Sequence, residues 1–132
     1  MKNIYSNIYS FDKKILKKTV NSLKQGNIAA LPTETVYGLA GNACSKKAIK
    51  KIFKLKKRPN YNPLIIHYHS IKSAKKDVIL NSNFFKLYKK YCPGPLTFVL
   101  KKTKKTRINQ LATAKLKTVA IRFPKHKIIR EI

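Results

Sequence analysis

Acidic residues are scarce in this sequence: 4 Asp and Glu stand against 31 Lys and Arg, and the formal net charge is +27. Because carboxylates are so few, a catalytic mechanism that needs a pair of them is not expected. A charge of this size attracts polyanions and speeds their encounter, which makes nucleic acid a candidate partner. Lysine, asparagine and isoleucine are abundant, a bias that drift in an AT-rich coding sequence also produces. A selected RNA-binding face and compositional drift therefore both stay open.

Cysteine and glycine are also scarce, and long apolar runs are missing. The two cysteines and three histidines have no metal-ligand spacing, so we expect neither a metal site nor a disulfide framework, and a cytoplasmic protein is the simplest interpretation. No apolar stretch approaches the ~20 residues of a membrane-spanning helix, so no membrane partner is expected. The sequence contains neither a Walker phosphate loop nor a dinucleotide-binding glycine pattern, and no catalytic residue can be assigned from spacing.

Apolar periodicity and turn residues predict that helices and strands intermix. Helices are predicted over residues 11–25, 46–57, 71–76 and 82–91. Strands are predicted over residues 28–31, 64–66, 96–100 and 119–123. Residues 101–117 are polar and basic, and we expect a mobile loop there, with at most a short helical turn. This order of elements indicates an α/β (α+β) domain around one sheet.

Two hydroxyl residues follow the first predicted strand. Thr33 and Thr35 lie in the segment 31–39, which leads from a buried strand into a glycine-containing turn. Ligands of α/β proteins bind at strand ends, and threonine hydroxyls can both donate and accept hydrogen bonds. An ordinary turn with hydroxyl caps explains the same residues, so spacing alone does not decide between a binding site and a structural turn.

Three cations stand where packing alone does not require them. Lys56 falls on the apolar face of its predicted helix, where a lysine must extend to solvent or meet an anion. Arg58 is held in an extended shape by the proline after it. Arg122 stands inside an apolar strand, where an arginine is either exposed or paired. Because acids are so few, bound phosphate or carboxylate groups are attractive partners for these cations, although a solvated lysine run also explains Lys56.

Five segments together resemble the YrdC-like family, whose members make threonylcarbamoyl-AMP. Their order and approximate spacing agree with that family over roughly residues 11–130. The segment at 93–100 is also explained structurally, because two prolines around a glycine make a stiff lead into a strand. The matching segments are L-P-T-E-T-V-Y-G-L at 31–39, K-x-R-P at 56–59, N-P-L-I-I-H at 62–67, P-G-P-L-T-F-V-L at 93–100 and T-V-A-I-R-F-P at 118–124.

The resemblance implies a YrdC-like twisted mixed sheet with flanking helices and a basic concave face. It also implies an L-threonylcarbamoyladenylate synthase, which is a nucleotidyltransferase of tRNA modification. Such an enzyme uses ATP with Mg²⁺, L-threonine and bicarbonate. Its product passes to the proteins that transfer the threonylcarbamoyl group to tRNA. By motif matching, the implied threonine-binding residues are Thr35, His67 and Arg122. The implied ATP-binding residues are Lys56, Arg58, Asn62 and Thr118. Thr33 and Thr97 are further candidates.

One departure from the family separates the competing functions. Family members continue past the arginine strand and carry a Ser-Ala-Asn segment that helps close the nucleotide site, whereas this sequence stops at Ile132. We therefore expect a single YrdC-like domain over residues 1–132 that is C-terminally incomplete and lacks strands. The alternative function is a non-catalytic, highly basic remnant that binds tRNA or double-stranded RNA. A related domain of hydrogenase-maturation carbamoyltransferases is a third interpretation.

Overall fold

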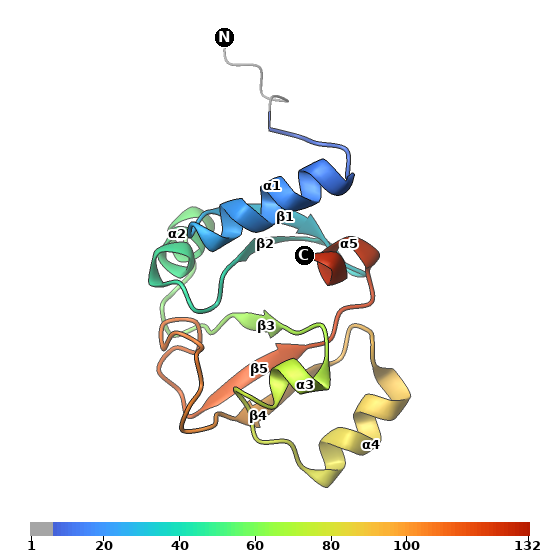
Figure 1. Cartoon of the computed structure of the whole chain (residues 1–132). Coiled ribbons are helices and arrows are strands. Elements are labelled where there is room, and N and C mark those ends of the chain that lie inside the picture. The colour runs from blue at the N-terminus through green and yellow to red at the C-terminus, as the bar shows by residue number, and fades with distance from the viewer. Residues whose placement is uncertain (1–6) are drawn as a thin grey trace.

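The computed structural model describes residues 7–132, so the first six residues of the domain predicted over 1–132 lie outside the described part (Figure 1). Helices and strands intermix along the chain, as predicted. The helices are α1 (Lys13–Lys24), α2 (Lys46–Lys56), α3 (Ile71–Ala74), α4 (Ser82–Tyr91) and α5 (Lys127–Glu131). The strands are β1 (Ile28–Pro32), β2 (Tyr37–Gly41), β3 (Ile65–His67), β4 (Thr97–Lys101) and β5 (Thr118–Arg122).

Side-chain caps fix where the longer helices begin. The Asp12 carboxylate accepts a hydrogen bond from the backbone N–H of Ile15 at 2.7 Å, and Ser45 and Asn81 cap α2 and α4 in the same way. Each cap satisfies a backbone donor that has no partner inside the helix. Gly26 ends α1 with a φ of +77°, a left-handed conformation that favours glycine. None of the helices formed by residues 7–132 is long and apolar enough to cross a lipid bilayer.

The strands form two sheets, where the sequence had suggested one. β1 and β2 pair antiparallel, and β5 lies between β3, which is parallel to it, and β4, which is antiparallel. No backbone ladder joins the two sheets among the described residues, and Figure 1 shows them as separate layers. The strand β2 was not predicted, because a glycine-containing turn was expected after the segment 31–39. A Cβ at Gly41 would come within 3.1 Å of Ala48 on α2, so glycine permits close packing there.

The three-stranded sheet has one buried and one open face. Phe98, Val119 and Ile121 alternate with less buried residues along β4 and β5, as expected when only one face is covered. Phe84 of α4 packs on the buried face, with its ring centroid 4.8 Å from that of Phe98 and 6.0 Å from that of Phe123. The helical side therefore contains the aromatic core, and the opposite face carries polar side chains such as Arg122 together with the exposed Val99.

The segment 101–117, predicted as a mobile loop, is tied to the core. The Asp77 carboxylate accepts hydrogen bonds from the Arg107 backbone N–H at 2.8 Å, the Tyr68 hydroxyl at 2.9 Å and the Thr106 hydroxyl at 3.2 Å. The Arg107 guanidinium forms an ion pair with it at 3.2 Å. Asp77 is 2% exposed, so a buried carboxylate holds the middle of the segment in place, although the Arg107 side chain itself is largely exposed.

The same segment also contributes apolar packing that its sparse hydrophobic residues did not predict. Ile108 is 5% exposed and belongs to the core, and Ala112 and Thr113 are fully buried. After Lys101, the last residue of β4, and the β-bridge at Lys102, the segment follows a series of turns. Its order is therefore set by tertiary contacts with the rest of the chain.

Candidate active site between the two sheets

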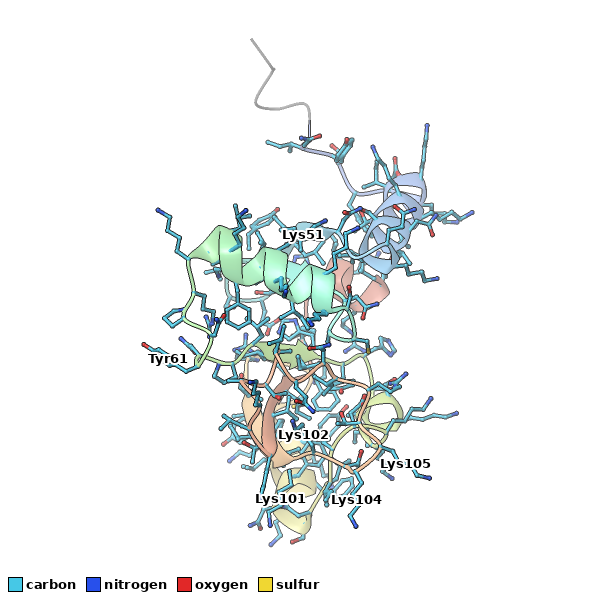
Figure 2. All side chains as sticks on the ribbon, turned by 90° about the vertical axis from the view of Figure 1, so that its left-hand side faces the viewer. Lys51, Tyr61, Lys101, Lys102, Lys104 and Lys105 are labelled. Carbon is cyan, nitrogen blue, oxygen red and sulfur yellow. The ribbon has the colours of Figure 1, made fainter. Side chains whose placement is uncertain are left out.

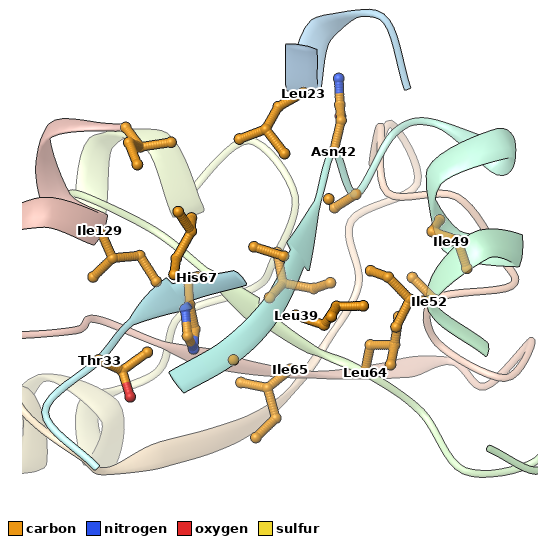
Figure 3. A pocket seen from close by; sticks show the side chains of 18 of the residues that line it. Leu23, Thr33, Leu39, Asn42, Ile49, Ile52, Leu64, Ile65, His67 and Ile129 are labelled. Carbon is orange, nitrogen blue, oxygen red and sulfur yellow. The ribbon is translucent and has the colours of Figure 1, made fainter. Parts of the chain in front are cut away.

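A cavity of about 540 Å³ lies between the two sheets. Its walls come from β1, β2, α2, β3 and β5, and the short helix α5 contributes Ile129. In Figure 3, Thr33 and His67 lie toward the side of Ile129, whereas Ile52 and Leu64 lie on the side of α2. The candidate residues that line the cavity are Thr33, Thr35, Lys56, Arg58, His67 and Arg122. The candidates that do not line it are Asn62, Thr97 and Thr118.

The β-sheet register places His67 and Arg122 side by side. They are Cα partners of the parallel pair β3–β5, and Arg122 also pairs with Thr97 of the antiparallel neighbour β4. The Thr97 hydroxyl oxygen accepts hydrogen bonds from Nε and Nη2 of Arg122 at 3.1 and 3.0 Å. One end of the open sheet face thus carries a fixed guanidinium beside an imidazole.

The environment of His67 favours a neutral ring. Burial lowers the pKa of His67, the guanidinium of Arg122 lowers that pKa further, and the carboxylate of Glu34 opposes the shift. The imidazole is therefore neutral at neutral pH, and one ring nitrogen can donate a hydrogen bond while the other accepts one.

The hydroxyl of Thr33 is occupied by the turn between β1 and β2. It accepts hydrogen bonds from the backbone N–H groups of Thr35 and Val36, both at 3.2 Å, and donates to the Val36 carbonyl. The Thr35 hydroxyl lies 3.0 Å from it and is exposed toward the cavity. These contacts favour the structural interpretation for Thr33, and they leave Thr35 as the hydroxyl available to a ligand.

Arg58 is positioned by the end of α2 and by the turn that follows. Lys57 ends the helix in a left-handed conformation, and the Arg58 N–H bonds back to the Phe53 carbonyl at 3.0 Å. The Arg58 guanidinium donates through Nε to the Asn62 carbonyl at 3.0 Å and through Nη2 to the Asn62 side-chain oxygen at 2.6 Å. Nη2 also donates to the Pro63 carbonyl at 2.7 Å. Within residues 7–132, Nη1 has no protein acceptor and can reach a ligand in the cavity.

Thr118 lies at the far end of the open sheet face. It shares that face with Arg122, four residues along β5, and this separation amounts to about 13 Å at the usual rise of a strand. The register puts it opposite Lys101 of β4. Thr118 is therefore separated from the residues around Arg122 and His67, and Arg58 with its partner Asn62 forms another group at the end of α2.

Glu34 is a residue near the site to which the sequence assigned no role. Its Oε2 accepts a hydrogen bond from the backbone N–H of Lys125 at 3.1 Å, and its Oε1 is buried without a partner among the described residues. Burial alone would raise the pKa of Glu34, but three backbone N–H groups and the charge of Arg122 hold it below its ordinary value. Spacing could not reveal this contact because its partner lies 91 residues later.

Among residues 7–132 there is no group of three or more His, Cys, Asp or Glu side chains that could hold a metal ion. The candidate residues that line the cavity offer cations, hydroxyls and a neutral imidazole. Such groups bind phosphates and carboxylates and stabilise negative charge that develops during group transfer.

Comparison with known proteins assigns this architecture to one family. The model of the Sua5/YciO/YrdC family, described as telomere recombination, matches residues 21–132. A threonylcarbamoyl-AMP synthase from Pyrococcus abyssi is 42% identical over 109 residues, which cover 80% of this chain and 31% of that protein. A putative threonylcarbamoyl-AMP synthase from Methanocaldococcus jannaschii is 33% identical over 136 residues, which cover 100% of this chain and 64% of that protein.

Solved structures agree with the fold. The structure of Pyrococcus abyssi Sua5 complexed with L-threonine superposes with a TM-score of 0.86 at 36% identity, over 93% of this chain and 37% of that one. Escherichia coli YciO shares the fold, with a TM-score of 0.80 at 23% identity over 92% of this chain and 59% of that one. The predicted mixed α/β architecture is thereby confirmed. The chain spans less than two thirds of the length of these relatives, and it belongs to the Sua5/YciO/YrdC family.

Proposed function

We propose that this chain carries the amino-acid and nucleotide sites of an L-threonylcarbamoyladenylate synthase. In this nucleotidyltransferase reaction, L-threonine, bicarbonate and ATP give threonylcarbamoyl-AMP, pyrophosphate and water. The observation that carries the proposal is that Arg58 and Arg122, two of only four arginines, line the same cavity. The names of relatives above 30% identity support this activity over a carbamoyltransferase domain.

The group around Arg122 suits an amino acid. Two guanidinium nitrogens on one edge bind a carboxylate in a bidentate manner, and Arg122 still has such an edge free. The neutral ring of His67 and the hydroxyl of Thr35 offer uncharged partners for the amine and the side-chain hydroxyl of threonine. The structure of Pyrococcus abyssi Sua5 was solved with L-threonine, which supports this choice of ligand for the present chain.

The group that begins at Arg58 suits a nucleotide. Arg58 and Lys56 are the cations at the α2 side of the cavity, and they would meet the phosphates of ATP. Asn62 and Thr118 are the other implied contacts, and Asn62 also holds Arg58 through its side chain. Mg²⁺ would enter with the nucleotide, held mainly by phosphate oxygens as is usual for this ion.

Electrostatic stabilisation is the main contribution that these residues can make to the reaction. When the carbamate oxygen attacks the α-phosphorus, negative charge builds on the phosphoryl oxygens and on the departing pyrophosphate. Lys56 and Arg58 would stabilise this charge because both line the cavity, and Arg58 is already oriented by its bonds to Asn62 and Pro63. Arg122 and His67 would hold the carbamate in line for attack.

Binding and turnover test the proposal separately. Calorimetry with residues 1–132 should detect binding of L-threonine and of ATP with Mg²⁺, with D-threonine as the control for the amino-acid site. Pyrophosphate release from ATP, measured with and without L-threonine and bicarbonate, then tests the reaction. Failure to bind either ligand would overturn the assignment of the site.

Arg58→Ala should weaken ATP binding at least tenfold, because the change removes a charged donor to the phosphates. Such a bond contributes about 1.5–3 kcal/mol. Lys54→Ala is the matched control, since Lys54 carries the same charge near the end of α2, four residues before Arg58, but does not line the cavity. The affinities are measured by calorimetry. Equal nucleotide affinity of Arg58→Ala and the wild type would contradict the placement of ATP.

For the surface outside the cavity we propose RNA as the partner. Proteins that transfer the threonylcarbamoyl group to tRNA are proposed as further partners, and the cytoplasm as the location. The observation that favours RNA is a basic segment at 101–105, held to the core through the buried Asp77. Figure 2 shows Lys101, Lys102, Lys104 and Lys105 gathered at one end of the molecule. The Lys102 ammonium donates to Thr113, which leaves the other three lysines for phosphate contacts.

A charge-matched pair of triple variants should reveal whether RNA contacts this segment. Changing Lys101, Lys104 and Lys105 to glutamine should make the slope of log Kd against log salt for tRNA shallower by about 3, because each lost phosphate contact removes about one unit. The control changes Lys86, Lys89 and Lys90, which are exposed on α4. Gel shifts over a salt series provide the slopes. Equal slopes for the two variants would attribute the binding to diffuse charge.

A further inference from the structure

The β4–β5 register gives Arg122 a neighbour that the proposed reaction does not otherwise use. Thr97 lies directly opposite Arg122 in the antiparallel pair, and both side chains are on the open face of the sheet. The Thr97 hydroxyl oxygen accepts hydrogen bonds from both Nε and Nη2 of the guanidinium. Thr97 itself does not line the cavity, whereas Arg122 does.

This contact divides the donors of the guanidinium. A guanidinium has two edges that can bind an anion in a bidentate manner: one formed by Nε and Nη2, and the other by Nη1 and Nη2. The Thr97 hydroxyl occupies the first edge of Arg122. The second edge has no protein acceptor among residues 7–132 and is the one left for a carboxylate.

The chemical nature of the acceptor matters as much as its position. A hydroxyl fixes the guanidinium without neutralising it, whereas a carboxylate in the same place would compete with an anionic ligand. The structural arginine Arg107 is paired with a carboxylate, that of Asp77. Arg58, which lines the cavity, is held only by carbonyl and amide oxygens. The hydrogen bonds that orient both cavity arginines thus end on neutral oxygens. The Glu34 carboxylate interacts with Arg122 through its charge but accepts no hydrogen bond from it.

The turn before β4 explains how Thr97 keeps its place. Gly94 donates its backbone N–H to the carbonyl of Phe123 at 2.8 Å, which links the start of β4 to the end of β5. A Cβ at Gly94 would lie 2.6 Å from the Tyr91 carbonyl oxygen, so only glycine fits. The stiff proline-glycine-proline segment therefore fixes the strand position that carries Thr97, next to Arg122.

We propose that Thr97 is a positioning residue of the amino-acid site: its hydroxyl holds one edge of the Arg122 guanidinium so that the opposite edge meets the ligand carboxylate. The inference rests on the proposed function, because the ligand is the L-threonine assigned to Arg122. It adds a residue that acts through Arg122 without touching the substrate.

Two variants at one position test this role. Thr97→Val keeps the branched shape that suits a strand but removes the hydroxyl, and Thr97→Ser keeps the hydroxyl. The dissociation constant for L-threonine should rise about tenfold in Thr97→Val and stay within about twofold of the wild type in Thr97→Ser, because valine alone removes the acceptor that orients Arg122 and water replaces only part of that hydrogen bond. NMR of the Arg122 Nε–H should show faster exchange with water in Thr97→Val alone.

The outcomes separate this inference from the proposed function. If the wild type binds L-threonine and Thr97→Val binds it equally well, the positioning role is wrong while the site assignment stands. Unchanged exchange of the Arg122 Nε–H in Thr97→Val would overturn the role even without ligand. If the wild type binds no L-threonine, the proposed function fails and the ligand-directed role of Thr97 fails with it. If Thr97→Ser and Thr97→Val lose the same affinity for L-threonine, side-chain shape and not the hydroxyl is responsible. That result would also overturn the positioning role of Thr97.

Discussion

Arg122→Gln is expected to weaken L-threonine binding by about a hundredfold. The substitution removes the charge and the free bidentate edge, and charge-assisted pairs of this kind contribute about 1.5–3 kcal/mol for each hydrogen bond. Arg122→Lys keeps the charge but loses the planar edge, so its affinity should lie between those of the wild type and Arg122→Gln. Calorimetry with L-threonine gives the three affinities.

Arg130→Gln is the matched control for charge. The Arg130 guanidinium donates to the Pro124 carbonyl at 3.2 Å and does not line the cavity. A readout without ligand is also available, because Arg122 lowers the pKa of His67. In Arg122→Gln the NMR titration of His67 should therefore move to higher pH. Threonine affinities that fall equally in Arg122→Gln and Arg130→Gln would refute the assignment of the carboxylate site.

Asp77→Ala should lower the free energy of unfolding by about 3–5 kcal/mol. The change leaves the Tyr68 hydroxyl and the Arg107 N–H without their buried acceptor, and each such loss costs about 1–3 kcal/mol. Glu131→Ala removes another of the four acids but breaks only an exposed pair with Lys127 at 3.9 Å. That control should change stability by less than about 0.5 kcal/mol. Urea unfolding at neutral pH measures both, and similar midpoints for the two variants would contradict the role of the network.

The same network predicts how stability depends on acidity. Burial alone would raise the pKa of Asp77, but its hydrogen bonds and the Arg107 guanidinium hold it below the ordinary value of about 3.9. Because protons bind the unfolded chain more readily, the Asp77 contribution is complete above that ordinary value and is lost as pH falls through the lowered pKa. On acidification below about pH 4, Asp77→Ala should therefore lose less stability than the wild type does, as urea unfolding at each pH measures, with the contribution of Glu34 remaining in both proteins.

Local signals predicted most of the secondary structure. The helix predicted over 82–91 has those bounds in the structure, because Asn81 caps it and a proline-rich turn follows. The strand β2 was missed because a glycine-containing turn was expected there, while the close approach of α2 is what requires a small residue at Gly41. The order of the segment 101–117 depends on Asp77, which is about 30 residues away in sequence, and no local pattern contains that information.

The sequence indicated the two arginines of the candidate site, but not the hydrogen-bond acceptors that orient them. Arg58 and Arg122 stood out because packing did not require them, and they do line one cavity. The sequence could not assign the oxygens that orient these arginines, because each contact depends on turn geometry or strand register. Thr97 lies 25 residues from Arg122, and Glu34 lies 91 residues from its partner Lys125. Tertiary structure alone reveals such pairs.

In the described chain no backbone hydrogen-bond ladder joins the two sheets, and the cavity is lined by residues of both. Thr35 belongs to the turn of one sheet and Arg122 to a strand of the other. A ligand that contacts both residues bridges the two sheets, and it dissociates when unfolding separates them. At a hundredfold excess over its Kd, such a molecule adds about 2.7 kcal/mol to the stability of the folded chain. The melting temperature of this protein should therefore rise as a ligand fills the cavity.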